Sequence, residues 1–470
     1  MADEDLRDLE VDTARDDGVE LDEENRLRGR FVDAVNDALE ARDEARVYEL
    51  VEPLHPADIA DLLELLPHER RLALVSAITD LMTPDVIAEL NDYVRDDLME
   101  ALPHGVVADI AEQLDTDDAV QLIEDLEPED QQAILAELDP EDRAAIESAL
   151  AYPEESAGRL MQRELVAVPE HMTVGMLIDY LREHDELTTE FWEVFVVDPS
   201  HKPVGTCALS WILRSPRAVA ISDVMQRDQT LIPVSMDQEE VALRFQKYGL
   251  ISAAVVDENG RLVGQLTVDD IVHIISEEAG EDILRLSGAG EGDINQPLGL
   301  TVRARLAWLI INLGTAILAA SVVGLFQGAI ARFALLAVLM PIVSGMGGNA
   351  GTQTLAVIVR ALATNQLTSS NTVRMIGREF RIALANGFTL GLLIGGATAL
   401  VFHNPLLGGV IGSAMVINNL TAGLAGVLVP ITLERLRIDP AVSSAVFVTT
   451  ATDVMGFFSF LGLAVLTGLA

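Results

Sequence analysis

The chain has 470 residues, of which 50% are hydrophobic, yet 75 Asp and Glu against 31 Lys and Arg give a formal net charge of −44. Charge and hydrophobicity are segregated, because residues 301–470 contain nine arginines and four acids while the first 300 residues carry the whole negative excess. Such an acidic surface repels nucleic acid and anionic lipid and attracts cations. The single cysteine, Cys207, excludes an internal disulfide and a cysteine-based metal cluster. The sequence therefore predicts an acidic soluble half joined to an almost uncharged membrane half.

Lysine is scarce in this chain, with Lys202 and Lys247 as its two copies. Acid-rich, lysine-poor surfaces are typical of proteins from a salty cytoplasm, where screening weakens the repulsion between like charges. Each surface acid therefore has a halophilic explanation as well as a functional one.

The first 155 residues are predicted to be helical after a disordered acidic start at residues 1–27. From residue 28 to 155, apolar residues recur at spacings of three and four, and prolines recur where helices would begin or end. Similar phrases begin at Pro56, Val107 and Asp117. This repetition predicts helical pairs stacked into a small superhelix.

Residues 156–278 change to short apolar strands that alternate with helices. Val194–Asp198 and Ala253–Asp257 are equivalent strands 59 residues apart, and each is followed by a turn, a second strand and a helix. The pattern predicts two copies of an α/β unit, at 156–222 and 223–278, followed by a linker helix within 279–303.

Residues 304–470 are predicted to be a transmembrane domain. Stretches with few charges are long enough for five helices, at about 306–327, 333–362, 378–402, 406–433 and 441–469. If the soluble half lies inside, the inner segments carry eight arginines and the outer segments carry Arg332 alone. The positive-inside rule then places the N-terminus in the cytoplasm and the C-terminus outside the cell.

Asp453 lies in the middle of the last predicted span, within Val448-Thr-Thr-Ala-Thr-Asp-Val-Met-Gly456. A carboxylate in hydrocarbon is costly, so such acids usually face a polar path or a partner. No basic residue lies at a matching depth in the neighbouring spans. This favours a cation pathway, and the alternative is a protonated Asp453 in an interhelical hydrogen bond.

A glycine-rich segment, Ser344-Gly-Met-Gly-Gly-Asn-Ala-Gly-Thr-Gln353, follows Pro341 in the second span. It is predicted to interrupt the helix and to line a cavity with the amides of Asn349 and Gln353. The alternative is a face of small residues for close helix packing. Asn418 and Asn419, in the fourth span, are predicted to form interhelical hydrogen bonds.

Signals for an enzyme are weak. His68-Glu-Arg-Arg lacks the second histidine of a zinc protease motif, and no phosphate-binding loop is present. The hard oxygen ligands that the chain offers suit Mg²⁺ or Ca²⁺ rather than zinc or copper. We therefore predict that the chain is not an enzyme and binds hard cations.

Three motifs, Gly345-Met-Gly-Gly-Asn-Ala-Gly-Thr-Gln, Asp439-Pro-Ala and Thr450-Ala-Thr-Asp-Val-Met-Gly, resemble the MgtE family of magnesium transporters. The repeat at 156–278 resembles a pair of cystathionine-β-synthase-type (CBS) domains. The resemblance implies a multi-domain membrane protein: a superhelical N-domain, an α/β CBS pair and a five-helix transmembrane domain. It also implies a homodimer in the cell membrane, with a Mg²⁺-selective pore on the dimer axis formed by Asp453, Gly345 and Asn349.

The same resemblance implies that intracellular Mg²⁺ binds between the soluble domains and closes the channel. The implied regulatory ligands are the backbone near Gly158 and the side chains of Asp237, Glu239, Asp270, Glu278, Glu281, Asp282 and Asp439, with Asp117 and Asp118 from the N-domain. Thr267 and Asp270 also resemble the CBS motif that contacts a nucleotide ribose, which implies an ATP site.

The predicted function is passive Mg²⁺ influx driven by the membrane potential and closed by intracellular Mg²⁺. The alternatives are a transporter of another divalent cation such as Co²⁺ or Mn²⁺ and, from another class, a membrane protease or a chloride channel with CBS sensors. The missing zinc and serine motifs disfavour the protease, and the small number of spans disfavours the chloride channel.

Overall fold

The computed structural model describes residues 20–22, 26–184, 191–287, 296, 298–368, 370–441 and 444–469, without the side chains of residues 282 and 287. Most of the segment predicted to be disordered lies outside these residues. The chain divides into two compact units, Met1–Ile275 and Ser276–Ala470. Helix α15 (Val268–Ser287) begins in the first unit and ends in the second.

The N-terminal part of the first unit is a stack of short helices. Proline begins four of them, α3, α5, α9 and α10, where its missing N–H costs no hydrogen bond. One apolar core runs through the stack, with Leu62, Leu122 and Ile123 almost completely buried. The helices are α1 (Gly29–Ala41), α2 (Glu44–Val51), α3 (Pro56–Leu65), α4 (His68–Ala77), η1 (Thr79–Leu81), α5 (Pro84–Ala88), α6 (Asp92–Ala101), α7 (His104–Ala111), α8 (Thr116–Glu124), α9 (Pro128–Glu137) and α10 (Pro140–Leu150).

Two three-stranded sheets of identical topology follow. In each, the first strand pairs parallel with the second and the second pairs antiparallel with the third. The first sheet consists of β1 (Ala167–Pro169), β2 (Glu193–Val197) and β3 (Pro203–Ala208), with α11 (Val174–Glu183), α12 (Leu209–Arg214) and α13 (Ile221–Val224). The second consists of β4 (Leu231–Pro233), β5 (Ser252–Val256) and β6 (Leu262–Thr267), with α14 (Gln238–Tyr248) and α15.

The predicted repeat is visible in how the two sheets meet. The Ser252 hydroxyl donates a hydrogen bond of 2.6 Å to the Glu193 carboxylate, and these residues hold the same position in β5 and β2. Phe195 and Ala254, also equivalent, lie in one apolar cluster. The two α/β copies therefore pack through their matching strands.

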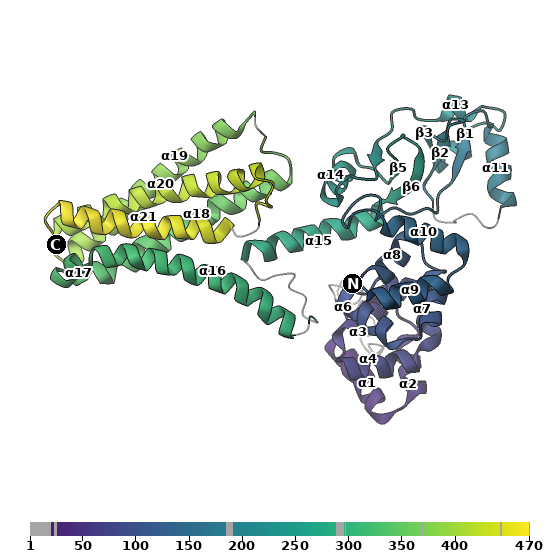
Figure 1. Cartoon of the computed structure of the whole chain (residues 1–470), viewed down its shortest axis with the longest axis horizontal. Helices are drawn as coiled ribbons and strands as arrows, with labels where there is room; N and C mark the ends of the chain where they lie inside the picture. The colour runs from purple at the N-terminus through teal and green to yellow at the C-terminus, as the bar shows by residue number, and fades with distance from the viewer. Residues whose placement is uncertain are drawn as a thin grey trace, which may run out of the picture. The chain divides into compact units, whose positions relative to one another are not determined.

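Long helices form the second unit (Figure 1). They are α16 (Leu298–Leu325), α17 (Gln327–Arg332), α18 (Leu335–Ala363), α19 (Thr372–Val401), α20 (Pro405–Arg435) and α21 (Ser444–Leu466). Among the described residues, five of these helices are long and apolar enough to cross a membrane, α17 being too short. The first begins at Leu298, earlier than expected, because apolar residues precede Arg303 and Arg305 and extend the helix.

Glycine allows α19 and α20 to touch along their backbones. A Cβ on Gly391 would lie 2.7 Å from the Gly412 carbonyl oxygen, and one on Gly395 would lie 2.7 Å from that of Gly408. Small residues of this kind let membrane helices approach closely, where dispersion rather than the hydrophobic effect holds them together.

The predicted interruption of the second span is wrong. Helix α18 runs continuously through Pro341 and the glycine-rich segment. Each glycine costs a helix about 1 kcal/mol relative to alanine, but Gly347 and Gly351 are buried against neighbouring helices, and this packing holds the helix together. The alternative of a small-residue packing face describes the segment correctly.

Candidate functional site

Asp453 lies on α21 and is held by α18. The Ser344 hydroxyl donates a short hydrogen bond to Asp453 Oδ1. Within the described part of the chain, no Lys, Arg or His nitrogen lies within 4.0 Å of this carboxylate. The carboxylate is thus positioned by a neutral hydroxyl and keeps its capacity to bind a cation.

Asn418 on α20 joins the two helices that carry Ser344 and Asp453. Its Nδ2 donates a 2.7 Å hydrogen bond to the carbonyl of Val343 on α18. A Cβ on Gly347 would lie 2.0 Å from that nitrogen, and one on Gly456 of α21 would lie 2.8 Å from it. The interhelical bond predicted for Asn418 is therefore present, and the two glycines make room for the amide. The prediction for Asn419 is wrong, because its Nδ2 donates to the carbonyl of Met415 one turn earlier in the same helix.

Gly345 and Asn349, the other predicted pore residues, lie one helical turn apart on α18. Both are exposed, and a Cβ on Gly345 would meet nothing within 4 Å. Because Gly345 follows Ser344, this face begins next to the Asp453 site. In the single chain the face is open, so it is available to a second copy or to water.

Three acids predicted to bind regulatory Mg²⁺ converge in the first unit. Asp117 and Asp118 lie in the first turn of α8, and Asp270 lies in the first turn of α15. Asp117 is 3% exposed, and its Oδ1 has no hydrogen-bond partner among the described residues. A buried acceptor without a donor is unusual in proteins, and an ordered water or a cation would satisfy it.

The pKa values of these acids are raised. Burial raises the pKa of Asp117 well above its usual value, and the charges of Asp270 and Asp118 add to the effect. Burial, followed by the charge of Asp270, raises the pKa of Asp118 to about 7. Burial also raises the pKa of Asp270 to about 6, against a lowering by its hydrogen bond from Thr267. Bound Mg²⁺ would stabilise all three charged forms.

Thr267 and Asp270, the predicted nucleotide residues, contact one another. The Thr267 hydroxyl donates a 2.6 Å hydrogen bond to Asp270 Oδ2, and Gln162 Nε2 donates to the same oxygen at 3.3 Å. The Asp270 carboxylate thus belongs to both predicted sites, the cation site and the ribose site.

The predicted site around Gly158 is also brought together by backbone pairing. Gly158 N donates to Val234 O at 2.9 Å, and Ser156 forms a bridge with Asp237. Asp237 caps α14 by accepting a 3.0 Å hydrogen bond from the backbone N–H of Glu239. Its carboxylate therefore has a structural role as an N-cap beside any role as a ligand.

Two of the predicted ligands in the second unit are joined by an arginine. Arg285 on α15 contacts Glu281 one turn earlier and donates a 2.8 Å hydrogen bond to Asp439 Oδ2. Glu278 lies one turn further back on the same helix, and the side chain of Asp282 lies outside the described residues. An arginine thus occupies the position between carboxylates where the resemblance implies a Mg²⁺ ion.

Sequence reasoning missed three of these features. Arg285 was open to prediction, because it follows Glu281 at the i,i+4 spacing that favours ion pairs. Ser344 was named as the first residue of the glycine-rich segment, and no bond to Asp453 was predicted for it. Glu379 lies in the first turn of the third predicted span, at 378–402, and was given no role, yet it is 6% exposed within α19. Glu112, Asp139 and Asp142 also approach within 4.8 Å of one another on the surface of the N-domain.

Three family models match the chain in the predicted order. The MgtE intracellular N domain matches residues 54–155, the CBS domain matches residues 221–277, and MgtE, described as a divalent cation transporter, matches residues 340–463. The magnesium transporter MgtE of Bacillus subtilis is 33% identical over 315 residues, which is 67% of this chain and 70% of that protein. The chain belongs to the MgtE family. The MgtE of Thermus thermophilus is 34% identical over 322 residues, 68% of this chain and 71% of that protein.

Two solved structures are similar to about half of the chain. The cytosolic domain of the Mg²⁺ channel MgtE in complex with ATP is 30% identical, covering 52% of this chain and 99% of that one with a TM-score of 0.47. The soluble part of a magnesium transporter is 25% identical, covering 53% and 98% with a TM-score of 0.45. The family prediction and the predicted fold class are confirmed, and the chain is a multi-pass membrane protein that transports Mg²⁺. Its family is one of transporters rather than enzymes.

Proposed function

We propose that two copies of this chain form a Mg²⁺ channel in the cell membrane, with Asp453 as its cation site and the cytoplasmic acids as its Mg²⁺ sensor. The observation that carries the proposal is the Asp453 carboxylate, held by Ser344 inside a membrane helix without a basic partner among the described residues. An acid in this setting is retained at a cost and therefore points to a cation path.

The pore would use the open face of α18 together with Asp453. Two copies related by a twofold axis would place two carboxylates, two Asn349 amides and two Gly345 backbones around one path. Mg²⁺ sheds its water reluctantly. Carboxylates and amides would therefore bind the hydrated ion, and the ring of charge would concentrate cations in the pore.

Transport in this scheme needs no coupled reaction. With the acidic half in the cytoplasm, an inside-negative potential of 100 mV drives a divalent cation inward by about 4.6 kcal/mol, twice the value for a single charge. The arginines of the inner segments support this orientation.

Regulation would operate through Arg285 and its two carboxylates. With Mg²⁺ scarce, Arg285 pairs with Glu281 and Asp439, as seen here. Rising Mg²⁺ would replace the guanidinium between the carboxylates. Leu286, the next residue, packs against a cluster that contains Val359 of α18 and Val448 of α21. A displacement of this end of α15 would therefore reach both helices proposed to line the pore.

The experiment is Mg²⁺ flux into proteoliposomes under an inside-negative potential. Asp453→Asn keeps an oxygen that can accept the Ser344 hydrogen bond but removes the charge, so flux should fall to the background of empty liposomes. Glu434→Gln, a matched loss of one charge at an exposed acid at the end of α20, should keep flux. Wild-type flux from a folded Asp453→Asn protein would remove the assignment. Competition by Co²⁺ and Mn²⁺ in the same assay tests the alternative cargoes.

A further inference from the structure

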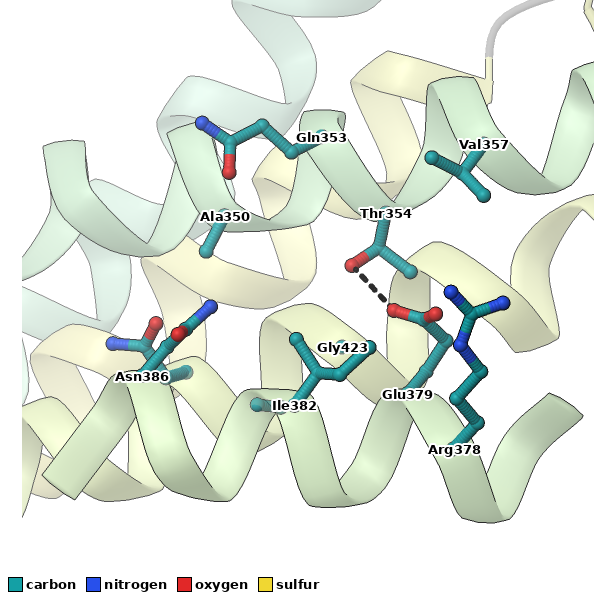
Figure 2. A pocket seen from close by; sticks show the side chains of 11 residues that line it. Ala350, Gln353, Thr354, Val357, Arg378, Glu379, Ile382, Asn386 and Gly423 are labelled. Atoms are coloured by element: carbon teal, nitrogen blue, oxygen red, sulfur yellow. Dashed lines mark hydrogen bonds between the residues drawn. The ribbon is translucent and has the colours of Figure 1, made fainter.

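A cavity of about 220 Å³ lies among α18, α19 and α20, apart from the Asp453 site. Figure 2 shows Thr354 on one helix pointing toward Glu379 on another, and Gln353 and Asn386 also line the cavity. We propose that this cavity, here called the Glu379 cavity, is a second cation-binding site within the membrane unit. The proposal does not depend on Asp453 being the pore site.

Glu379 supplies the charge. Its side chain is 6% exposed, and its carboxylate accepts a long hydrogen bond of 3.5 Å from the Thr354 hydroxyl. Across the described residues, no basic nitrogen lies within 4.0 Å of it. A buried carboxylate with one weak partner is costly unless a cation or further donors complete its surroundings.

Asn419 supplies a second, independent observation. It lines the cavity and is completely buried. Its Nδ2 donates to the carbonyl of Met415 at 3.0 Å, while its Oδ1 has no hydrogen-bond partner in the part of the chain that the structure describes. A buried amide oxygen without a donor and a buried carboxylate with one weak hydrogen bond therefore both lie in the walls of the same cavity, and a cation in it would stabilise either group.

The cavity and the Asp453 site lie on different faces of α18. Ser344 contacts Asp453 and Thr354 contacts Glu379, and the two residues are ten positions apart in the helix. Ten residues correspond to about 15 Å along the axis and to about 80° of rotation around it. The Glu379 cavity is therefore a separate site rather than an extension of the proposed pore face.

The chemistry of the walls selects a hard cation. Carboxylate, hydroxyl and amide oxygens from Glu379, Thr354, Asn386 and Asn419 are ligands that Mg²⁺ and Mn²⁺ accept, and no sulfur or imidazole lines the cavity. Arg378 is exposed beside it and is the feature that would favour a lipid phosphate instead. The negative charge of Glu379 would repel an anion bound in the same cavity. The Asn419 oxygen, which lacks a donor, can bind only a cation or a hydrogen-bond donor.

The experiment places a nitroxide spin label at the cavity and uses Mn²⁺ as a paramagnetic probe. Val357→Cys provides the label site, because Val357 lines the cavity, is exposed and has no ligand atom. The native Cys207 is buried and its thiol pKa is raised to about 11 by burial, so it resists labelling. Val338→Cys, exposed elsewhere on α18, is the control position that reports random collisions with Mn²⁺.

In full-length protein in phosphatidylcholine liposomes, Mn²⁺ should broaden the spectrum of the label at 357 more than that at 338. Glu379→Gln should remove this difference and Thr354→Val should shift it to higher Mn²⁺, while Asp453→Asn should leave it unchanged. A difference that persists in Glu379→Gln, or that is absent from the wild type, would refute the site. If the difference in broadening depends on added phosphatidylglycerol and on Arg378 instead of Glu379, the cavity binds a lipid headgroup, and the proposal is also overturned. If Glu379→Gln fails to fold, Thr354→Val tests the proposal instead. Broadening at the same Mn²⁺ concentration as in the wild type would then contradict the site.

Discussion

Neutralising Asp270 should stabilise the soluble unit when Mg²⁺ is absent. The pKa of Asp270 is raised from 3.8 to about 6 in the folded chain. Between these values the folded state keeps a proton that the unfolded state releases, so stability falls as pH rises through this window and stays low above it. At pH 8 the charged carboxylate therefore weakens the fold, and Asp270→Asn removes that charge while leaving an oxygen to accept the Thr267 hydrogen bond.

The magnitude follows from the size of the shift. About two pKa units correspond to about 100-fold in the equilibrium between folded and unfolded states, or about 3 kcal/mol. Hydrogen–deuterium exchange of the α8 amides in the full-length chain, at pH 8 with a chelator, should slow by up to about this factor in Asp270→Asn. Mg²⁺ should slow exchange in the wild type and have a much smaller effect in the variant, because a ligand is gone.

Asp109→Asn is the matched control for this experiment. Asp109 is an exposed acid on α7, so its replacement makes the same change in net charge without touching the cluster of Asp117, Asp118 and Asp270. If the two variants slow exchange equally, general repulsion across an acidic surface explains the effect. If Asp270→Asn exchanges faster than the wild type, the reasoning from buried charge is wrong.

Three further outcomes are expected. The slowing of hydrogen–deuterium exchange by Mg²⁺ in the soluble unit should weaken as pH falls from 8 to 6, because Asp118, with a pKa of about 7, takes up a proton that competes with the ion. An equal slowing at pH 6 would contradict this. Arg285→Gln should let the channel close at a several-fold lower Mg²⁺ concentration, because loss of an ion pair is worth about 1 kcal/mol. Arg374→Gln, at an exposed helix end, should leave that concentration unchanged, and current measured against cytoplasmic Mg²⁺ tests both variants. Gly347→Ala should lower the thermal midpoint and the flux, because its Cβ would lie 2.0 Å from a buried amide nitrogen, while Gly396→Ala, with nothing within 4 Å, should lower neither.

Much of the fold was predictable because it depends on local patterns. Prolines at the starts of short helices and the 59-residue spacing of equivalent strands are properties of the sequence, and the structure follows both. Hydrophobic length likewise predicted the five spans. The continuity of α18 was not predictable from propensity, because four glycines in its middle argue against a helix and only packing against α20 and α21 overrides them.

The site was predictable where one residue carries the signal and not where partners meet across helices. A lone acid in an apolar span identifies Asp453 without any structure, but its bond to Ser344 joins residues 109 positions apart. Glu379 was missed because it lies near a predicted span boundary, where an acid is ordinary. Its burial results from how α18 and α20 cover that part of α19, which no periodicity in the sequence reports.

The measurement that tests the central claim most directly is patch-clamp current against cytoplasmic Mg²⁺ at fixed high KCl. Wild-type current should fall as Mg²⁺ rises, because the ion binds the acids that favour the closed state. The combined variant Asp270→Asn, Glu278→Gln, Glu281→Gln and Asp282→Asn should conduct as well as the wild type at low Mg²⁺ and stay open as Mg²⁺ rises. Closure of this variant at the wild-type Mg²⁺ concentration would show that these acids are surface charge and that the sensor lies elsewhere.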